Sequence, residues 1–208
     1  MRLLMLCLCL LLAGCVTEIN GKPAPPPMEP KGEFAQLPFA PTQKMMERLL
    51  AGEDKAKQEV LAAPNKVTPP VLFALALLLE QQGDHQGALF WYFTAQLRAR
   101  SDANKSLDPT VSAGVTELGN QFGGPIEQYA GSHPEVVRYI VPKVLRWDAK
   151  VTREYDPRWV ALQGQDVRTK TVIAFQSQGK WPEIDRITRE GFARGFRRAM
   201  QQQERRLP

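Results

Sequence analysis

Few residues in this chain have the type and spacing that catalysis or metal binding requires. The two histidines, His85 and His133, are far apart in the sequence and form no His-x-x-x-His pair, the arrangement that places two metal ligands on one helix face. Glu117 and Glu127 could serve glycoside hydrolysis, for example of peptidoglycan, which needs two carboxyl groups roughly 5 to 10 Å apart across a cleft. Neither lies in a motif typical of that chemistry. We therefore expect no metal, no cofactor and no catalytic residue.

Nucleophilic catalysis has equally little support. The chain contains no Gly-x-Ser-x-Gly motif. All three cysteines, Cys7, Cys9 and Cys15, lie close to the N-terminus. The remainder of the chain has no thiol, which excludes a disulfide, a cysteine-ligated zinc and a cysteine nucleophile from it.

The segment 90–104 combines four consecutive aromatic residues with charged ones. Four adjacent aromatic side chains cannot share one face of a helix, so at least one should contact a second surface. Aromatic residues and arginine dominate the energetics of interfaces. We therefore predict a partner-binding surface at the end of this helix, formed by Tyr92, Arg98, Arg100, Asp102 and Asn104. Core packing with a salt-bridged helix end is the alternative.

This surface requires a particular orientation of the helix. Trp91 and Leu97 are predicted to be buried against the preceding helix, because helical hairpins pack along their apolar faces. Tyr92, Arg98 and Arg100 are predicted to be at least partly exposed, close to Asp102 or Asn104.

The hydrophobic pattern predicts an all-α domain. The 208 residues, 43% of them apolar, suffice for one domain with extended ends. Apolar residues recur at helical spacing, and no segment alternates with the period of a strand. The segments predicted to be helical are 42–62, 69–82, 86–100, 110–122, 126–130, 133–148 with a kink at Pro142, a weaker 165–177, and one from Trp181.

Turn residues are predicted to separate these helices. Helix-ending signals are found at Ala63-Pro64-Asn65, at Gly83 and at Gly123-Gly124-Pro125, and 155–159 is predicted to be a loop. The last helix is expected to pack through four apolar residues and to leave its arginines in solvent. These four are Ile184, Ile187, Phe192 and Phe196.

One helical pair has a recognisable pattern. Ala76-x-x-Leu79, Gly83-Asp84 and Ala88-Leu89-x-Trp91-Tyr92-x-x-Ala95 together resemble one repeat of the tetratricopeptide or Sel1-like class. A solenoid needs about three repeats to be stable, and the sequence shows no second clear copy. The resemblance therefore implies a single helical hairpin of this type inside a compact all-α domain.

The N-terminus has the pattern of an export signal. Arg2 precedes an apolar run that is too short to span a bilayer. The run ends in Leu12-Ala13-Gly14-Cys15, which resembles the lipobox of bacterial lipoproteins. The resemblance implies cleavage after residue 14 and lipidation of Cys15, so that a lipid anchors the protein to a membrane. Val16 follows the cysteine where a retention signal would have Asp, which by the resemblance implies the outer membrane rather than the inner one. We expect the lipid-anchored protein on the periplasmic face of that membrane.

A proline-rich segment follows the predicted lipidation site. Its seven prolines prevent a regular helix, and such a chain behaves as a semi-rigid spacer; they are Pro23, Pro25, Pro26, Pro27, Pro30, Pro38 and Pro41. The predicted organisation is a signal peptide at 1–14, a lipidated cysteine and tether at 15–41, and a helical domain at 42–206.

Charge and export together limit the partners. The formal net charge is +5, and residues 138–208 carry 16 Lys and Arg against 8 Asp and Glu. In a cytoplasmic protein, a basic C-terminal half would indicate binding to nucleic acid. An exported lipoprotein does not routinely meet nucleic acid, so we expect no such partner. Lipid headgroups, lipopolysaccharide phosphates, peptidoglycan carboxylates and an acidic protein are the candidate polyanions, and a solvated helix face is the alternative.

The predicted function is that of a non-enzymatic envelope lipoprotein, a helical scaffold or adaptor that contacts an envelope protein. Two alternatives remain open. One is an immunity lipoprotein that neutralises a secreted antibacterial toxin. The other is a peptidoglycan-acting enzyme or its activator.

Overall fold

The fold is all-α, as predicted. The computed structural model describes residues 30–205, apart from the side chains of residues 203 and 204. The predicted signal peptide, Cys15 and most of the tether lie outside the described residues. The helices are η1 (Gly32–Gln36), α1 (Phe39–Leu50), α2 (Asp54–Ala62), α3 (Pro69–Gln81), α4 (His85–Ala103), α5 (Val111–Ser132), α6 (Pro134–Lys150), η2 (Pro157–Gln163), α7 (Asp166–Thr169), η3 (Gln178–Lys180) and α8 (Trp181–Glu204).

Helices α3 and α4 form the centre of the molecule. Helix α3 begins with Pro69 and Pro70 in the first turn, where a missing N–H costs nothing, and its side chains are buried almost all round. At the turn to α4, Gly83 adopts a φ of 81°, and the Asp84 carboxylate accepts a hydrogen bond from the N–H of Gly87 at 2.9 Å. Helix α4 then contacts α3, α5, α6 and α8.

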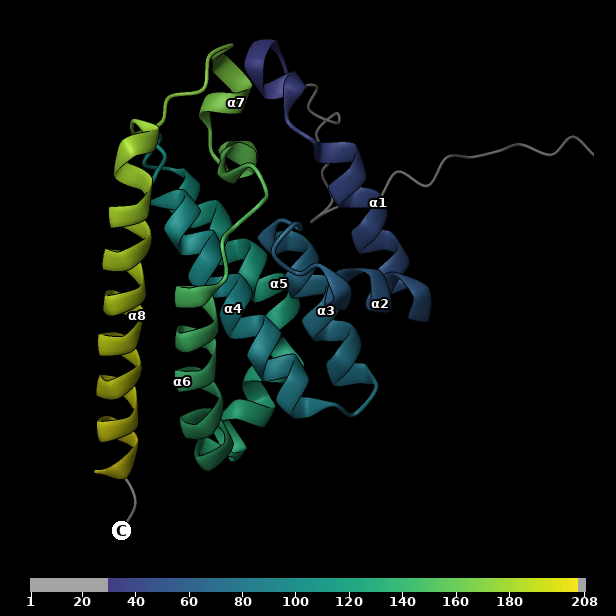
Figure 1. Cartoon of the computed structure of the whole chain (residues 1–208), viewed down its shortest axis with the longest axis vertical. Coiled ribbons are helices and arrows are strands. Elements are labelled where there is room, and N and C mark those ends of the chain that lie inside the picture. The colour runs from purple at the N-terminus through teal and green to yellow at the C-terminus, as the bar shows by residue number, and fades with distance from the viewer. Residues whose placement is uncertain (1–29, 206–208) are drawn as a thin grey trace, which may run out of the picture.

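The outer helices flank this pair on two sides. Figure 1 shows α6 and α8 running alongside each other at one flank, while α1 and α2 lie at the opposite flank. Phe192, Phe196 and Met200 of α8 pack against the main core as partly buried side chains. None of the helices within residues 30–205 has the length and apolar character that crossing a membrane requires.

The N-terminal boundary of the folded part differs from the prediction. Residues 30–41 were assigned to the tether, but Phe34 and Leu37 are buried in a small cluster with Ala161 and Val167. Helix α1 already begins at Phe39. Pro41 is compatible with this start because it occupies the first helical turn.

Two predicted helix boundaries are wrong. The expected helix 42–62 is split into α1 and α2, because Gly52 takes a φ of 77° that ends α1. Conversely, α5 continues through Pro125 to Ser132. Phe122 and Ile126 are both buried, so packing on both sides of the proline compensates for the lost backbone hydrogen bond.

The segment 165–177 is helical only over α7. Beyond it the backbone is extended and pairs with the chain that follows α4: the N–H of Leu107 donates to Ala174 O at 2.9 Å, and that of Gln176 to Lys105 O at 2.8 Å. Part of the expected loop 155–159 belongs to η2 instead, whose Trp159 is buried. This pairing places the start of α8 beside the end of α4.

Candidate binding cleft between α6 and α8

The buried face of α4 changes from apolar to charged along its length. Trp91 and Ala95 are buried, and the next positions on the same face are Arg98, Asp102 and Lys105. All three charged side chains are almost completely inaccessible, at 0%, 0% and 2% exposure. Charged residues are almost never fully buried unless they are paired, so the neighbouring elements must supply their partners.

Asp148 on the last turn of α6 binds three arginines. It accepts hydrogen bonds from Arg98 Nε at 3.0 Å, Arg153 Nη2 at 3.2 Å and Arg189 Nε at 3.1 Å. Burial alone would raise the pKa of this carboxyl, but the charges of Arg153 and Arg98 outweigh it and hold the pKa below its usual value. The Arg98 guanidinium also lies 4.5 Å from the centre of the Trp147 ring.

Asp102 is surrounded by donors from three segments: the turn after α4, the segment after α6, and η2. It accepts from Lys105 Nζ at 3.1 Å, Arg153 Nη1 at 3.4 Å, the Tyr155 hydroxyl at 3.0 Å and Trp159 Nε1 at 2.9 Å. Burial raises the pKa of Asp102, and the cations Lys105 and Arg153 oppose that shift. Burial likewise raises the pKa of Tyr155.

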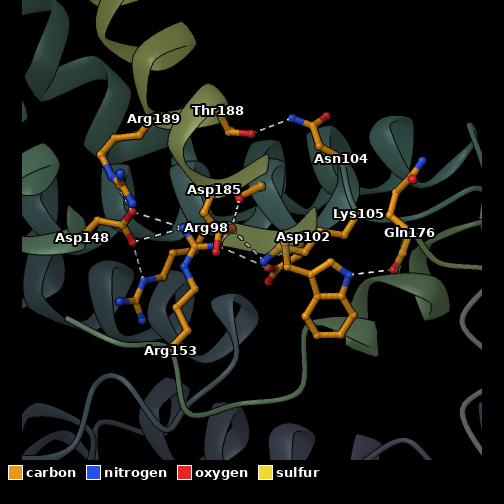
Figure 2. A network of polar contacts seen from close by, with 12 residues as sticks. Arg98, Asp102, Asn104, Lys105, Asp148, Arg153, Gln176, Asp185, Thr188 and Arg189 are labelled. Carbon is orange, nitrogen blue, oxygen red and sulfur yellow. Dashed lines mark hydrogen bonds and ion pairs between the residues drawn. The ribbon is translucent and has the colours of Figure 1, made fainter. Parts of the chain in front are cut away.

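Asp185 connects α8 to this network. Its carboxylate pairs with Lys105 Nζ at 2.8 Å and Arg153 Nη1 at 2.8 Å, and it accepts a short hydrogen bond from the Ser101 hydroxyl. Arg153 therefore bridges all three aspartates. Figure 2 shows the arrangement, with Asp148 facing three arginines and Asp185 paired with Lys105 and Arg153.

A cleft of about 560 Å³ opens beside this network. Its lining comes from the end of α6, the segment that follows it, and the start of α8, with Lys105 after α4 and Gln178 of η3. The charged residues of the lining are Lys105, Asp148, Lys150, Arg153, Asp185 and Arg189. Trp181 provides its largest aromatic surface and holds its own position by donating from Nε1 to Gln176 O at 2.8 Å.

The structure contradicts part of the predicted partner surface. Tyr92 and Arg98 were expected to be partly exposed, but they are 1% and 0% exposed, and Asp102 is equally buried. Arg98 and Asp102 belong to the internal network, which explains their burial. Arg100 and Asn104 are exposed, and the Asn104 amide donates to the Thr188 hydroxyl at 2.9 Å. Trp91 and Leu97 are buried, as predicted.

Tyr92 has a local role in packing. Its hydroxyl donates a short hydrogen bond to Glu127 on α5. Burial, together with this contact to Glu127, raises the pKa of Tyr92. Glu117 and Glu127 are both exposed along α5, and neither contributes to the cleft between α6 and α8.

The two histidines, distant in the sequence, are close in space. Their rings stack on the ring of Tyr129, with centroid distances of 4.3 Å for His85 and 4.0 Å for His133. The Glu80 carboxylate lies 2.9 Å from His85 Nδ1. No group of three potential metal ligands occurs within residues 30–205.

The last helix follows its prediction only in part. Phe192 and Phe196 pack against the core, but Ile187 is 49% exposed. Thr188 takes the buried position on that turn, and Arg189 points toward Asp148 rather than to bulk solvent. The reason is that α8 packs against the charged end of α4 before it reaches the apolar part of the core.

Sequence reasoning missed most of the network. Its undetected members are Lys105, Asp148, Arg153, Tyr155, Trp159, Asp185 and Arg189. One signal was available: Arg98, Asp102 and Lys105 continue the spacing of Trp91 and Ala95, which places charges on a face that is otherwise buried.

A second, smaller cleft includes the exposed members of the predicted surface. It encloses about 280 Å³ between α4 and α5 and is lined by Arg100 and Asn104 together with Gln96, Ser112 and Asn120. It shares no lining residue with the cleft between α6 and α8.

Comparison of this chain with protein-family models, curated proteins and solved structures finds no match.

Proposed function

We propose that this chain is a non-enzymatic lipoprotein of the cell envelope, anchored through a lipid on Cys15 and acting as a helical scaffold or adaptor. The proposed location is the periplasmic face of the outer membrane. The N-terminal pattern ending in Leu12-Ala13-Gly14-Cys15 supports the lipid anchor, and the resemblance of 76–95 to a tetratricopeptide-type hairpin supports a role in protein contact.

The pairing of the three aspartates of the network, two of which line the cleft, is the observation that favours binding over catalysis. Asp148 is bound by three arginines, Asp102 by Lys105, Arg153 and two neutral donors, and Asp185 by Lys105 and Arg153. A general acid or base must exchange its proton with a substrate within hydrogen-bond reach. Carboxylates held by several donors are poorly suited to that task, and here they fasten α8 to α4.

The cleft between α4 and α5 is the proposed contact surface. Arg100 and Asn104 are exposed there at the end of the central helix. The fold positions them rigidly, because α4 is packed on several sides. Arginine on a rigid element is well suited to a protein interface.

Site-specific photo-crosslinking of the full-length chain in cells tests this proposal. A photoreactive residue in place of Arg100 should form an adduct with one envelope protein, and the same residue in place of exposed Lys44 on α1 should not. Asn104→Ala should reduce the adduct at position 100. Absence of a position-dependent adduct would contradict the adaptor role, as would cleavage of peptidoglycan by the purified chain that is lost in Glu117→Gln or Glu127→Gln.

A further inference from the structure

The charges around the cleft between α6 and α8 do not balance. Four cations meet three carboxylates: Arg98, Lys105, Arg153 and Arg189 against Asp102, Asp148 and Asp185. Lys150 adds a further positive charge in the lining. Charges withdrawn from water are normally compensated by a counter-charge. With Lys150 the cations exceed the carboxylates by two, so the arrangement can accept an additional anionic group.

Several donors of this network are not used. Arg189 is engaged within residues 30–205 only through Nε, which leaves its two terminal nitrogens available toward the cleft. Lys150 is exposed in the cleft lining and has no ion pair among the described residues. Behind them, Arg98 Nη1 is buried and has no hydrogen-bond partner in the described part of the chain.

The cleft has the size and the mixed lining of a small-molecule site. Its volume of about 560 Å³ lies within the roughly 300 to 1,000 Å³ that is usual for ligand pockets. Trp181, Pro157 and Pro182 provide apolar surface, while Thr152 and Gln178 provide polar groups. The start of α8 adds the positive end of a helix dipole.

We propose that this cleft binds a small organic carboxylate of peptide-like chemistry. The ligand carboxylate pairs with the terminal nitrogens of Arg189 and with Lys150. An apolar group of the ligand packs on Trp181, and a ligand N–H donates to Asp185. The proposal is independent of the adaptor role, because the two clefts share no lining residue.

Two features favour a carboxylate over a phosphate. Asp148 and Asp185 lie in the same lining and would repel a dianion more strongly than a monoanion. The planar fork of a guanidinium also matches the two oxygens of a carboxylate. A peptide carboxylate could come from a protein C-terminus or from a cell-wall stem peptide, and the same chemistry serves both.

Calorimetric titration of the full-length chain tests the ligand class. The probes are acetyl-L-Ala-L-Ala, acetyl-D-Ala-D-Ala, the C-terminal amide of each peptide, and inorganic phosphate. At least one acid should bind, and its amide should bind at least about tenfold more weakly because the charge-assisted hydrogen bonds are lost. Preference for the L or the D acid distinguishes a protein C-terminus from a stem peptide.

Matched variants test the location of the site. Arg189→Gln and Lys150→Gln should each weaken binding of the acid several-fold, whereas Arg197→Gln, exposed on the same helix, and Lys44→Gln should not. Arg189 also binds Asp148, so Arg189→Gln could weaken ligand binding by destabilising the fold. If Arg189→Gln lowers the midpoint of unfolding, Lys150→Gln decides the location of the site. The proposal is overturned if neither acid binds at millimolar concentration, if acid and amide bind equally, if phosphate binds as tightly as the acid, or if the four variants behave alike.

Discussion

Arg98 is a completely buried member of the charge network, and its contribution to stability can be measured directly. Its side chain is wholly buried and pairs with Asp148, which is buried as well. Removing one partner of a buried ion pair costs about 3 to 5 kcal/mol, because the remaining charge loses compensation. We therefore expect Arg98→Ala to lower the free energy of unfolding by about that amount in urea denaturation.

Arg100→Ala is the matched control for that substitution. Arg100 is exposed two positions further along α4, and its guanidinium carbon lies 6.0 Å from the centre of the Phe192 ring. Its removal should change the free energy of unfolding by less than about 1 kcal/mol. Equal destabilisation by the two substitutions would show that the buried ion pair of Arg98 contributes no more to stability than the exposed Arg100 does.

The two buried aspartates should have opposite effects on the pH dependence of stability. The pKa of Asp148 is lowered in the folded protein, so its stabilisation is present above the unfolded value of about 3.9 and is lost as pH falls. The pKa of Asp102 is raised, so its contribution is present below the unfolded pKa and is lost as pH rises through the folded one. Urea denaturation at several pH values separates the two groups.

Two isosteric variants provide the comparison. Between about pH 5 and pH 3, the free energy of unfolding of the unmodified protein should fall with decreasing pH. Asp148→Asn should make this fall shallower, and Asp102→Asn should make it steeper. If the curves of unfolding free energy against pH are parallel for the unmodified protein and Asp148→Asn, Asp148 has the same pKa in the folded and the unfolded state.

At the residue scale, the sequence singled out Arg98 and Asp102 of α4 but placed them on a partner-binding surface, whereas both are buried. Arg98 and Asp102 were identified as interaction residues, yet their partners are in the fold rather than in another protein. Asp148, Arg153 and Asp185 come from segments distant in the chain. Only the packing of α6 and α8 on α4 brings these side chains together, and local spacing contains no information about that packing.

At the element scale, the close approach of α4 and α5 depends on one glycine. A methyl group at Gly123 would lie 2.2 Å from the Tyr92 hydroxyl oxygen, whereas one at Gly124 would meet nothing within 4 Å. Gly123→Ala should therefore destabilise the protein by about 1 to 2 kcal/mol despite the better helix propensity of alanine. Gly124→Ala should stabilise it by about 0.5 to 1 kcal/mol.

Thermal unfolding of the two glycine variants, together with a double variant, tests this packing. Tyr92→Phe removes the hydroxyl that a methyl group at position 123 would approach. Gly123→Ala should therefore destabilise the Tyr92→Phe variant less than it destabilises the unmodified protein, because the effects of substitutions at contacting residues are not additive. If Gly123→Ala and Gly124→Ala shift the melting temperature in the same direction, α4 and α5 are not in contact at this position.

The helices that were predicted well are those whose capping residues and apolar pattern agree with their packing in the fold. Helix α3 begins after Thr68 with two prolines and is apolar throughout, and α8 begins at Trp181. Prediction failed where packing overrides a local signal, as at Pro125 within α5. It also failed beyond α7, because 174–176 pairs its backbone with 105–107 instead of continuing the helix.

At the scale of the whole molecule, the described part is one packed body that begins before the predicted domain boundary. Burial of Phe34 and Leu37 fixes the chain from about residue 32 to the body. A tether would then comprise fewer residues than 15–41. It would leave the body near η1 and α7, which Figure 1 shows together at one end of the molecule.

Lipidation of Cys15 is the prediction on which the proposed location depends. The thiolate is the group that accepts a lipid, so Cys15→Ser should yield an unlipidated chain retained mostly as precursor. Fractionation with labelled palmitate should show incorporation in the unmodified protein and none in Cys15→Ser. Cys9→Ser is the control, because that residue lies inside the predicted signal and should be dispensable.

Several acyl chains anchor a protein far more firmly than one, so the unmodified protein should remain with membranes at high salt. Normal processing and membrane association of Cys15→Ser would remove the basis for placing this protein in the envelope by a lipid, while leaving the carboxylate site to be judged on its own titrations.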